Sequence, residues 1–131
     1  MNVIIAGTRH NVDPKIVDEA IEESGFEVTG VISGAALGID RQGEKWAQKR
    51  GIGVRSFPAD WKAYGRAAGP MRNEEMAKVG DALIALPCKH SKGTLDMIQR
   101  AKRHQIPVFE RMVPCMFGVV TGRRPVPKPQ S

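Results

Sequence analysis

The sequence predicts an α/β protein with a Rossmann-like, three-layer fold. Short apolar runs alternate with segments of helical periodicity along residues 1–110. These runs are too uniformly apolar to leave one face of a sheet in water, which favours a mostly parallel, five-stranded sheet with helices on both sides. A chain of 131 residues has the length of one domain.

The first strand is predicted over residues 2–6, an apolar run that stops at Gly7. A helix follows, because Asp13 can cap a helix that starts at Pro14, and apolar residues repeat at helical spacing as far as Gly25. Residues 26–33 form the next apolar run and predict the second strand.

The second half of the chain continues this alternation. A helix is predicted from Asp40 to Arg50, where Gly51 ends it. The remaining elements are a strand over 53–57, a long connection over 58–69, a helix over 70–79, a strand over 81–86, a helix over 94–104 and a strand over 107–110. We expect the strand order 3-2-1-4-5, in which the winding reverses between strands one and four. Ligands bind such sheets beside the carboxyl ends of the strands at that reversal.

The loops after strands one, two and four would therefore share one crevice. In the loop of residues 33–38, Ser33, Gly34 and Gly38 would let the backbone approach an anion, towards which the next helix directs its positive end. The alternative is that the glycines only permit tight packing and that Asp40 caps the helix. A second turn of the same kind, Gly93-Thr94, favours the binding interpretation.

Other side chains in or near these loops suit a nucleotide. Arg9 and Arg72 offer planar forks for phosphate, and Asn73 offers a donor and an acceptor for a base or ribose, although each could also be a surface residue or a cap. Trp61 could stack on a base, or it could close the core under its loop. The predicted ligand-binding residues are Gly7, Thr8, Arg9, Ser33, Gly34, Gly38, Asp40, Trp61, Arg72, Asn73, Lys92, Gly93 and Thr94. Neither GxxxxGK[ST] nor GxGxxG is present, which disfavours ordinary ATPase and dinucleotide dehydrogenase chemistry.

Three of these motifs carry a resemblance to a known family. SGAALGID at 33–40, AGPMRN at 68–73 and Lys92-Gly93-Thr94 resemble the SLOG superfamily, and within it the YspA/YpsA-related (YAcAr) family, over residues 2–109. The resemblance implies a cytoplasmic protein that binds a nucleotide or nucleotide-derived ligand as a sensor, carrier or sequestering protein. Its motif positions are Gly34, Gly38, Asp40, Arg72, Asn73, Gly93 and Thr94.

Two relatives of that family imply alternative functions. LOG-type phosphoribohydrolases cleave the N-glycosidic bond of nucleotides with a glutamate, but Met97 stands at that position here. An oxocarbenium-like transition state needs a carboxylate, so Asp40 or Asp60, with Arg72, are the candidates for a hydrolase. DprA-type proteins bind single-stranded DNA, and they share the SGxAxGID motif and an Arg-Asn pair.

The charge distribution bears on that second alternative. Of the net charge of +6, four charges lie in residues 111–131, so residues 1–110 are only weakly basic. We therefore divide the chain into a nucleotide-binding domain, 1–110, and a basic, proline-containing extension, 111–131.

The remaining predictions concern assembly and cofactors. The apolar part of the extension could cover a sheet edge or a second subunit, and we expect a homodimer or higher oligomer. Cys88 and Cys115 are not in a CxxC pair, so we expect reduced, structural cysteines and neither a metal nor a cofactor. No segment has the pattern of a signal peptide or a membrane span.

Overall fold

Five parallel strands form one sheet in the order β3-β2-β1-β4-β5 in the computed structural model, which describes residues 1–116. The strands are β1 (Asn2–Gly7), β2 (Gly30–Ser33), β3 (Gly53–Ser56), β4 (Ala82–Leu86) and β5 (Val108–Glu110). Every neighbouring pair runs parallel. The predicted Rossmann-like class and strand order are confirmed.

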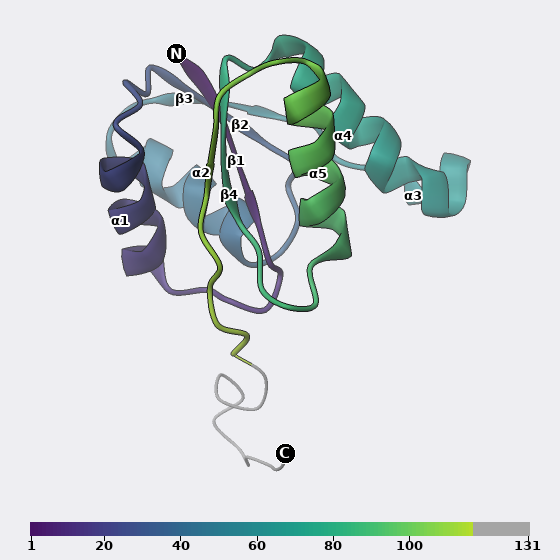
Figure 1. Cartoon of the computed structure of the whole chain (residues 1–131), viewed down its shortest axis with the longest axis horizontal. Coiled ribbons are helices and arrows are strands. Elements are labelled where there is room, and N and C mark those ends of the chain that lie inside the picture. Colours follow the sequence, from purple (N-terminus) through teal and green to yellow (C-terminus); the bar gives the residue numbers. More distant parts are fainter. Residues whose placement is uncertain (117–131) are drawn as a thin grey trace.

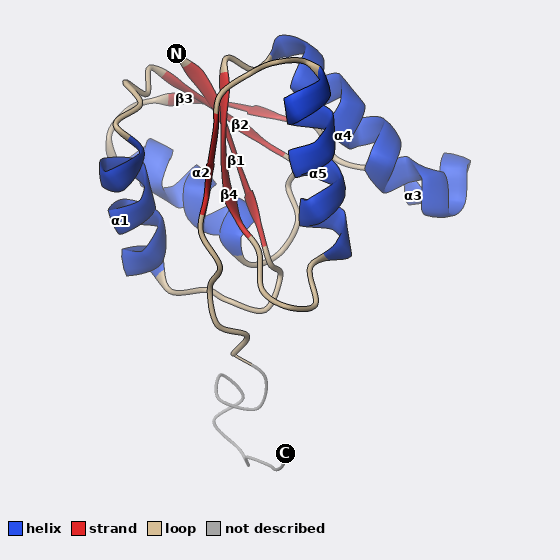
Figure 2. Ribbon diagram, viewed as in Figure 1, coloured by secondary structure: helices blue, strands red, loops and turns tan. Residues whose placement is uncertain are grey.

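Helices cover both faces of this sheet (Figures 1 and 2). On one face α1 (Pro14–Ser24) and α2 (Ile39–Lys49) enclose a core that contains Val3 and Ile5 of β1. On the other face α4 (Ala68–Val79) and α5 (Lys92–Arg103) enclose a core that contains Ile4 and Ala6. Successive β1 side chains thus enter opposite layers, which explains why the strand is apolar throughout.

The second strand is shorter than predicted. It begins at Gly30 rather than at residue 26, and Gly30 is the first residue of β2 that pairs with β1, opposite Asn2. The backbone N–H groups of Thr29 and Gly30 both donate to the Met1 carbonyl oxygen, which closes this end of the sheet.

The connection over 58–69 is helical rather than irregular. It contains α3 (Trp61–Tyr64), a 3-10 turn (Gly65–Ala67) and the start of α4 at Ala68. Asp60 caps α3 by accepting from the Ala63 N–H at 3.1 Å. In Figure 1, α3 projects beyond α4 at one end of the molecule. Pro70 lies in the first turn of α4, where no intrahelical N–H is required.

The chain stays on the domain after β5. Residues 111–116, here called the strap, place Val113 in the core at 5% exposure. The Val113 N–H donates to the Pro87 carbonyl (2.8 Å) and the Met116 N–H to the His10 carbonyl (2.7 Å). The strap therefore packs with the predicted domain. The rest of the predicted extension, 117–131, lies outside the described residues.

Within residues 1–116, no helix is both long and apolar enough to cross a lipid bilayer.

Candidate functional site

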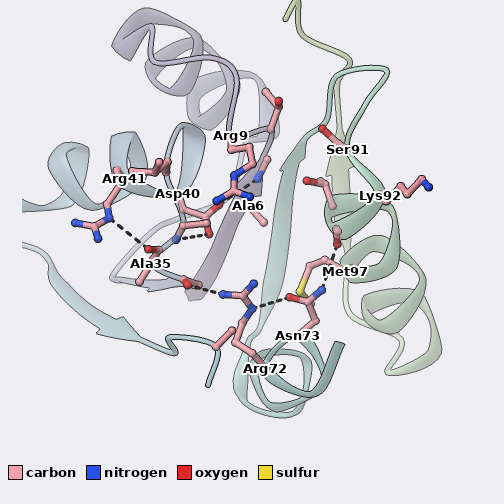
Figure 3. A pocket seen from close by; sticks show the side chains of 18 of the residues that line it. Ala6, Arg9, Ala35, Asp40, Arg41, Arg72, Asn73, Ser91, Lys92 and Met97 are labelled. Atoms are coloured by element: carbon pink, nitrogen blue, oxygen red, sulfur yellow. Dashed lines mark hydrogen bonds between the residues drawn. The ribbon is translucent and has the colours of Figure 1, made fainter. Parts of the chain in front are cut away.

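A pocket of about 550 Å³ opens at the carboxyl ends of the central strands (Figure 3). The loops after β1, β2 and β4 line it together, as the reversal of winding between β1 and β4 predicts. Residues 58, 59 and 61 from the connection after β3 and the first turns of α4 complete the wall. The sequence-predicted residues in the lining are Gly7, Thr8, Arg9, Gly34, Asp40, Trp61, Arg72, Asn73, Lys92, Gly93 and Thr94.

The pocket is electrostatically positive. Its permanent cations are Arg9, Arg41, Arg72 and Lys92, whereas Asp40 is the single carboxylate that lines it within residues 1–116. Lys92 extends away from the centre of the site in Figure 3, whereas the positive charge of Arg72 is close enough to Asp40 to act on its pKa. An excess of fixed positive charge in a concave site favours an anionic ligand.

Gly38 and Ser33, both predicted to contact ligand, lie outside the pocket lining. Gly38 has φ 81° and caps α2, and a Cβ there would lie 2.4 Å from the Thr8 carbonyl oxygen. This glycine allows the loops after β1 and β2 to touch. The Ser33 hydroxyl is buried; it donates to Glu44 (2.6 Å) and accepts from the Ala35 N–H (3.0 Å). Both residues therefore shape the glycine-rich loop.

Gly7 and Gly93 differ in what surrounds them. A Cβ on Gly7 would lie 2.6 Å from the Leu86 carbonyl oxygen, so this glycine is needed for the close packing of the two central strands' ends. A Cβ on Gly93 would meet no atom of residues 1–116 within 4 Å. Packing in this part of the chain therefore does not require a glycine at position 93, which lines the pocket.

The packing alternative, in which Asp40 caps α2, is wrong on this point, because Gly38 holds the cap position. The Asp40 carboxylate accepts from the backbone N–H groups of Gly7 and Ala36, each at 3.3 Å, and so joins two loops of the pocket. Burial, with 5% of the residue exposed, raises the pKa of Asp40 to about 6. The two N–H groups and the positive charge of Arg72 act in the opposite direction.

Arg72 and Asn73 are engaged with the protein on the floor of the site. Nη1 of Arg72 donates to the carbonyl oxygens of Gly34 and Phe57, and Nε donates to the Asn73 Oδ1 at 3.0 Å. The Asn73 amide donates in turn to the Gly93 carbonyl (3.2 Å) and to Asp96 (3.0 Å). Of the three guanidinium nitrogens of Arg72, only Nη2 has no hydrogen-bond partner within residues 1–116. Arg72 and Asn73 therefore position the loops more than they offer donors to a ligand.

Two helices begin at the pocket without a side-chain cap. Gly38 at α2 has no side chain, and Ser91 at α5 turns its hydroxyl to accept from the Cys88 N–H at 2.9 Å. In contrast, α1 and α3 are capped by Asp13 and Asp60. In α2 the first N–H, that of Ile39, donates to the Thr8 carbonyl (3.0 Å). Within residues 1–116, the N–H groups of Asp40 and Arg41 in α2, and of Lys92, Gly93 and Thr94 in α5, are the ones left open to an anion. The Thr94 hydroxyl lies beside them at 7% residue exposure, with no hydrogen-bond partner in the described part of the chain.

Trp61 stands at the rim with 59% of its surface exposed. The alternative that it closes the core is therefore wrong; only the edge of its ring approaches Gly69, where a Cβ would lie 3.2 Å away. Trp61 is a flat apolar surface next to the pocket. Asp60, in contrast, is absent from the lining and acts as the cap of α3.

Sequence reasoning did not single out several lining residues. His10, Arg41, His90 and Ser91 all line the pocket. Three of them lie in the loops already singled out, so their position beside the predicted residues was the available signal. Burial and the nearby charges of Arg9 and His90 lower the pKa of His10. Met97, at the position of the LOG-type glutamate, is buried and also lines the pocket.

In the described part of the chain, no group of three or more histidine, cysteine, aspartate or glutamate side chains is arranged to hold a metal ion.

Comparison with known proteins agrees with these motifs. A model of the YspA, cpYpsA-related SLOG family matches residues 1–64, which run from β1 through α3. The Gene 61 protein of Mycobacterium phage D29 is 33% identical over 117 residues, covering 82% of this chain and 93% of that protein. The chain belongs to the YspA, cpYpsA-related SLOG family. Membership of this SLOG family associates the chain with nucleotide-related binding or processing. No solved structure matches the chain.

Proposed function

We propose that the protein binds a nucleotide or nucleotide-derived ligand, of the size of a mononucleotide or ADP-ribose, as a sensor, carrier or sequestering protein. The observation that carries the proposal is the joint opening of two uncapped helix N-termini, α2 and α5, into one positively charged pocket. Family membership supports the same class of ligand.

The pocket offers separate surfaces for the parts of such a ligand. Phosphate oxygens would accept from the N–H groups at the starts of α2 and α5, from the Thr94 hydroxyl and from Arg9. A base or ribose would lie against the exposed ring of Trp61. A volume of about 550 Å³ falls within the usual range for small-molecule sites, roughly 300–1,000 Å³.

The test is a thermal-shift and tryptophan-fluorescence titration with AMP, ADP-ribose, inorganic pyrophosphate and a short single-stranded oligonucleotide. We expect AMP or ADP-ribose to raise the unfolding midpoint and to change the emission of Trp61, and a Trp61→Phe variant to lose the fluorescence change. A shift with the oligonucleotide alone would contradict the proposal in favour of single-strand binding, for which affinity falls steeply with salt.

A matched pair of charge variants separates a local contact from a general attraction. Arg9→Gln removes a cation from the pocket, whereas Lys89→Gln removes one from an exposed position in the loop after β4, outside the lining. A charge-assisted hydrogen bond is worth about 1.5–3 kcal/mol, so we expect Arg9→Gln to weaken binding roughly tenfold or more and Lys89→Gln to leave it unchanged. Equal losses in the two variants would show that no contact with Arg9 exists.

One observation favours hydrolysis of the bound nucleotide as a second candidate. Asp40 brings a buried carboxylate with a pKa of about 6 into the pocket, where it could serve as acid or base. Asp60 lies outside the lining and loses this role. Chromatography of each bound ligand decides the matter: free base or ribose phosphate would favour the hydrolase, and unchanged ligand the binder. The predicted homodimer stays a prediction, which light scattering of the same samples would test.

A further inference from the structure

Two cysteines that are far apart in the sequence meet beside the pocket. Cys88 follows β4 and is 2% exposed, and Cys115 lies half-buried in the strap. Backbone hydrogen bonds hold the two segments together on both sides of Cys115: Val113 donates to the Pro87 carbonyl (2.8 Å), and Met116 donates to the His10 carbonyl (2.7 Å). The Asn11 side chain adds a third tie, to the Pro114 carbonyl at 3.0 Å.

The Cys88 thiol is surrounded by polar groups rather than packed as an apolar side chain. Its Sγ lies 3.0 Å from the Thr8 hydroxyl, 3.4 Å from the His90 N–H and 3.5 Å from the Ser91 hydroxyl. The thiols of Cys88 and Cys115 also interact with each other. Burial raises the pKa of Cys88, but the hydrogen bonds from Cys115, Ser91 and Thr8 outweigh burial and lower it to about 7.

The environment of Cys115 completes the pair. Its thiol accepts from the backbone N–H groups of His90 and Lys89, next to Cys88 in the chain. Both cysteines are free in the structure. Within the described residues the two thiols do not belong to a group of three or more histidine, cysteine, aspartate or glutamate side chains that could hold a metal ion.

We propose that Cys88 and Cys115 are a redox-active thiol pair, which a peroxide converts into a disulfide that covalently ties the strap to the loop after β4. In the first step one thiol attacks a peroxide oxygen, and a sulfenic acid and one water form. In the second step the other thiol displaces a second water from the sulfenic acid. Two thiols and one hydrogen peroxide thus give one disulfide and two waters, and a small thiol reductant reverses the change.

The disulfide would act on the pocket directly. Thr8 and Ser91, both hydrogen-bonded to the Cys88 sulfur, line the pocket. Oxidation removes the thiol hydrogens from this network and fixes the loop that starts α5. This consequence rests on the proposed ligand site, whereas formation of the disulfide itself does not.

The experiment is a titration of the reduced, full-length protein with hydrogen peroxide, followed by intact mass, free-thiol count and peptide mapping. We expect the loss of two hydrogens, the loss of both thiols and a Cys88–Cys115 cross-linked peptide, all reversed by dithiothreitol. The unfolding midpoint should rise on oxidation, because the cross-link restrains the unfolded chain. Cys115→Ser should show neither the cross-link nor the rise.

Three outcomes would overturn the proposal. In the first, both thiols of the wild type persist at a peroxide concentration that oxidises Cys88 in the Cys115→Ser variant. In the others, oxygen is added without a cross-link, or a disulfide forms only between two molecules. The unfolding midpoint of reduced Cys115→Ser shows whether this variant is folded. If it is unstable, Cys88→Ala, which removes the other thiol, takes its place in the same experiment. None of these readouts uses a nucleotide, so they do not depend on the proposed function.

Discussion

At the scale of single residues, the pocket is built from side chains that hold loops and side chains that remain open to a ligand. Asp40 and Arg72 belong to the first group, since each bonds backbone groups of other loops. Arg9 and Thr94 belong to the second, since their side chains make no hydrogen bond to residues 1–116. Variants of the first group should change stability, and variants of the second should change binding.

The raised pKa of Asp40 predicts a pH dependence of stability. Because the folded protein binds this proton more readily than the unfolded chain, the cost of burying the charge is absent below pH 4, develops between pH 4 and 6 and is complete above. We expect the stability of the wild type relative to Asp40→Asn to rise by roughly 2 kcal/mol from pH 7 to pH 4. Urea unfolding of both proteins across this range is the measurement, and a constant difference would contradict the assignment.

Two glycines of the pocket should respond differently to alanine. A Cβ at Gly34 would lie 2.5 Å from Nη1 of Arg72, so Gly34→Ala must displace the guanidinium group and should cost about 1–3 kcal/mol. A Cβ at Gly93 meets no atom of the described residues within 4 Å, and alanine favours a helix more than glycine does. Gly93→Ala should therefore unfold at the same temperature or higher, yet bind AMP or ADP-ribose more weakly. Equal unfolding midpoints for both variants would contradict this reasoning.

At the scale of elements, α4 and α5 are joined by a chain of polar contacts that starts at the pocket. Asn73 of α4 reaches Asp96 of α5, Arg100 bonds Asp96 (2.9 Å) and Glu74 (3.1 Å), and His104 lies 2.7 Å from Glu74. Hydrogen bonds to Glu74 from His104 and Arg100 lower its pKa. This contact chain keeps the α5 N-terminus at a fixed position beside Arg72.

Asn73→Ala should therefore loosen the pair of helices. The substitution leaves the Gly93 carbonyl without its donor and removes one partner of Asp96 at a site that is 5% exposed, at a cost of about 1–3 kcal/mol. Lys78→Ala on the same helix, which breaks an exposed pair with Glu75, is the control and should change the unfolding free energy by less than about 0.5 kcal/mol. Chemical denaturation distinguishes the two.

The elements show how far sequence patterns carry a prediction. Continuous apolar strands, the Asp13-Pro14 cap and the glycine-rich loops depend on local chemistry, and they predicted the sheet order and most of the pocket lining. Other contacts between distant segments were not predicted. The start of β2 depends on where β1 begins, Ser33 turns to Glu44, and Val113 packs into the core, and each of these facts is decided by a partner remote in the chain.

At the scale of the whole molecule, the strap belongs to the folded unit. It contributes Val113 to the core and Arg111, which pairs with Glu23 (2.8 Å) and Glu19 (3.5 Å) of α1. Residues 117–131, outside the described part, carry three of the six net positive charges. Most of the positive charge of the predicted extension thus lies in residues 117–131, whereas the contacts that stabilise the fold lie in the strap.

Two truncations test this division. A chain that ends at residue 116 should keep the unfolding midpoint and the nucleotide affinity of the full chain, with weaker attraction to polyanions because positive charge is lost. A chain that ends at residue 110 should unfold at a clearly lower temperature, since it loses a buried valine and the backbone bonds of the strap. Equal midpoints for the two truncations would exclude the strap from the core.

The central place of β1 also has a consequence for synthesis on the ribosome. Residues 2–7 emerge first and pair early with β2, but their other neighbour, Ala82–Leu86, is translated much later. Until then the growing chain has an apolar strand with one open edge, the kind of surface that chaperones and proteases recognise. A nascent chain stalled before residue 82 should therefore be digested faster than one stalled after the whole protein has emerged.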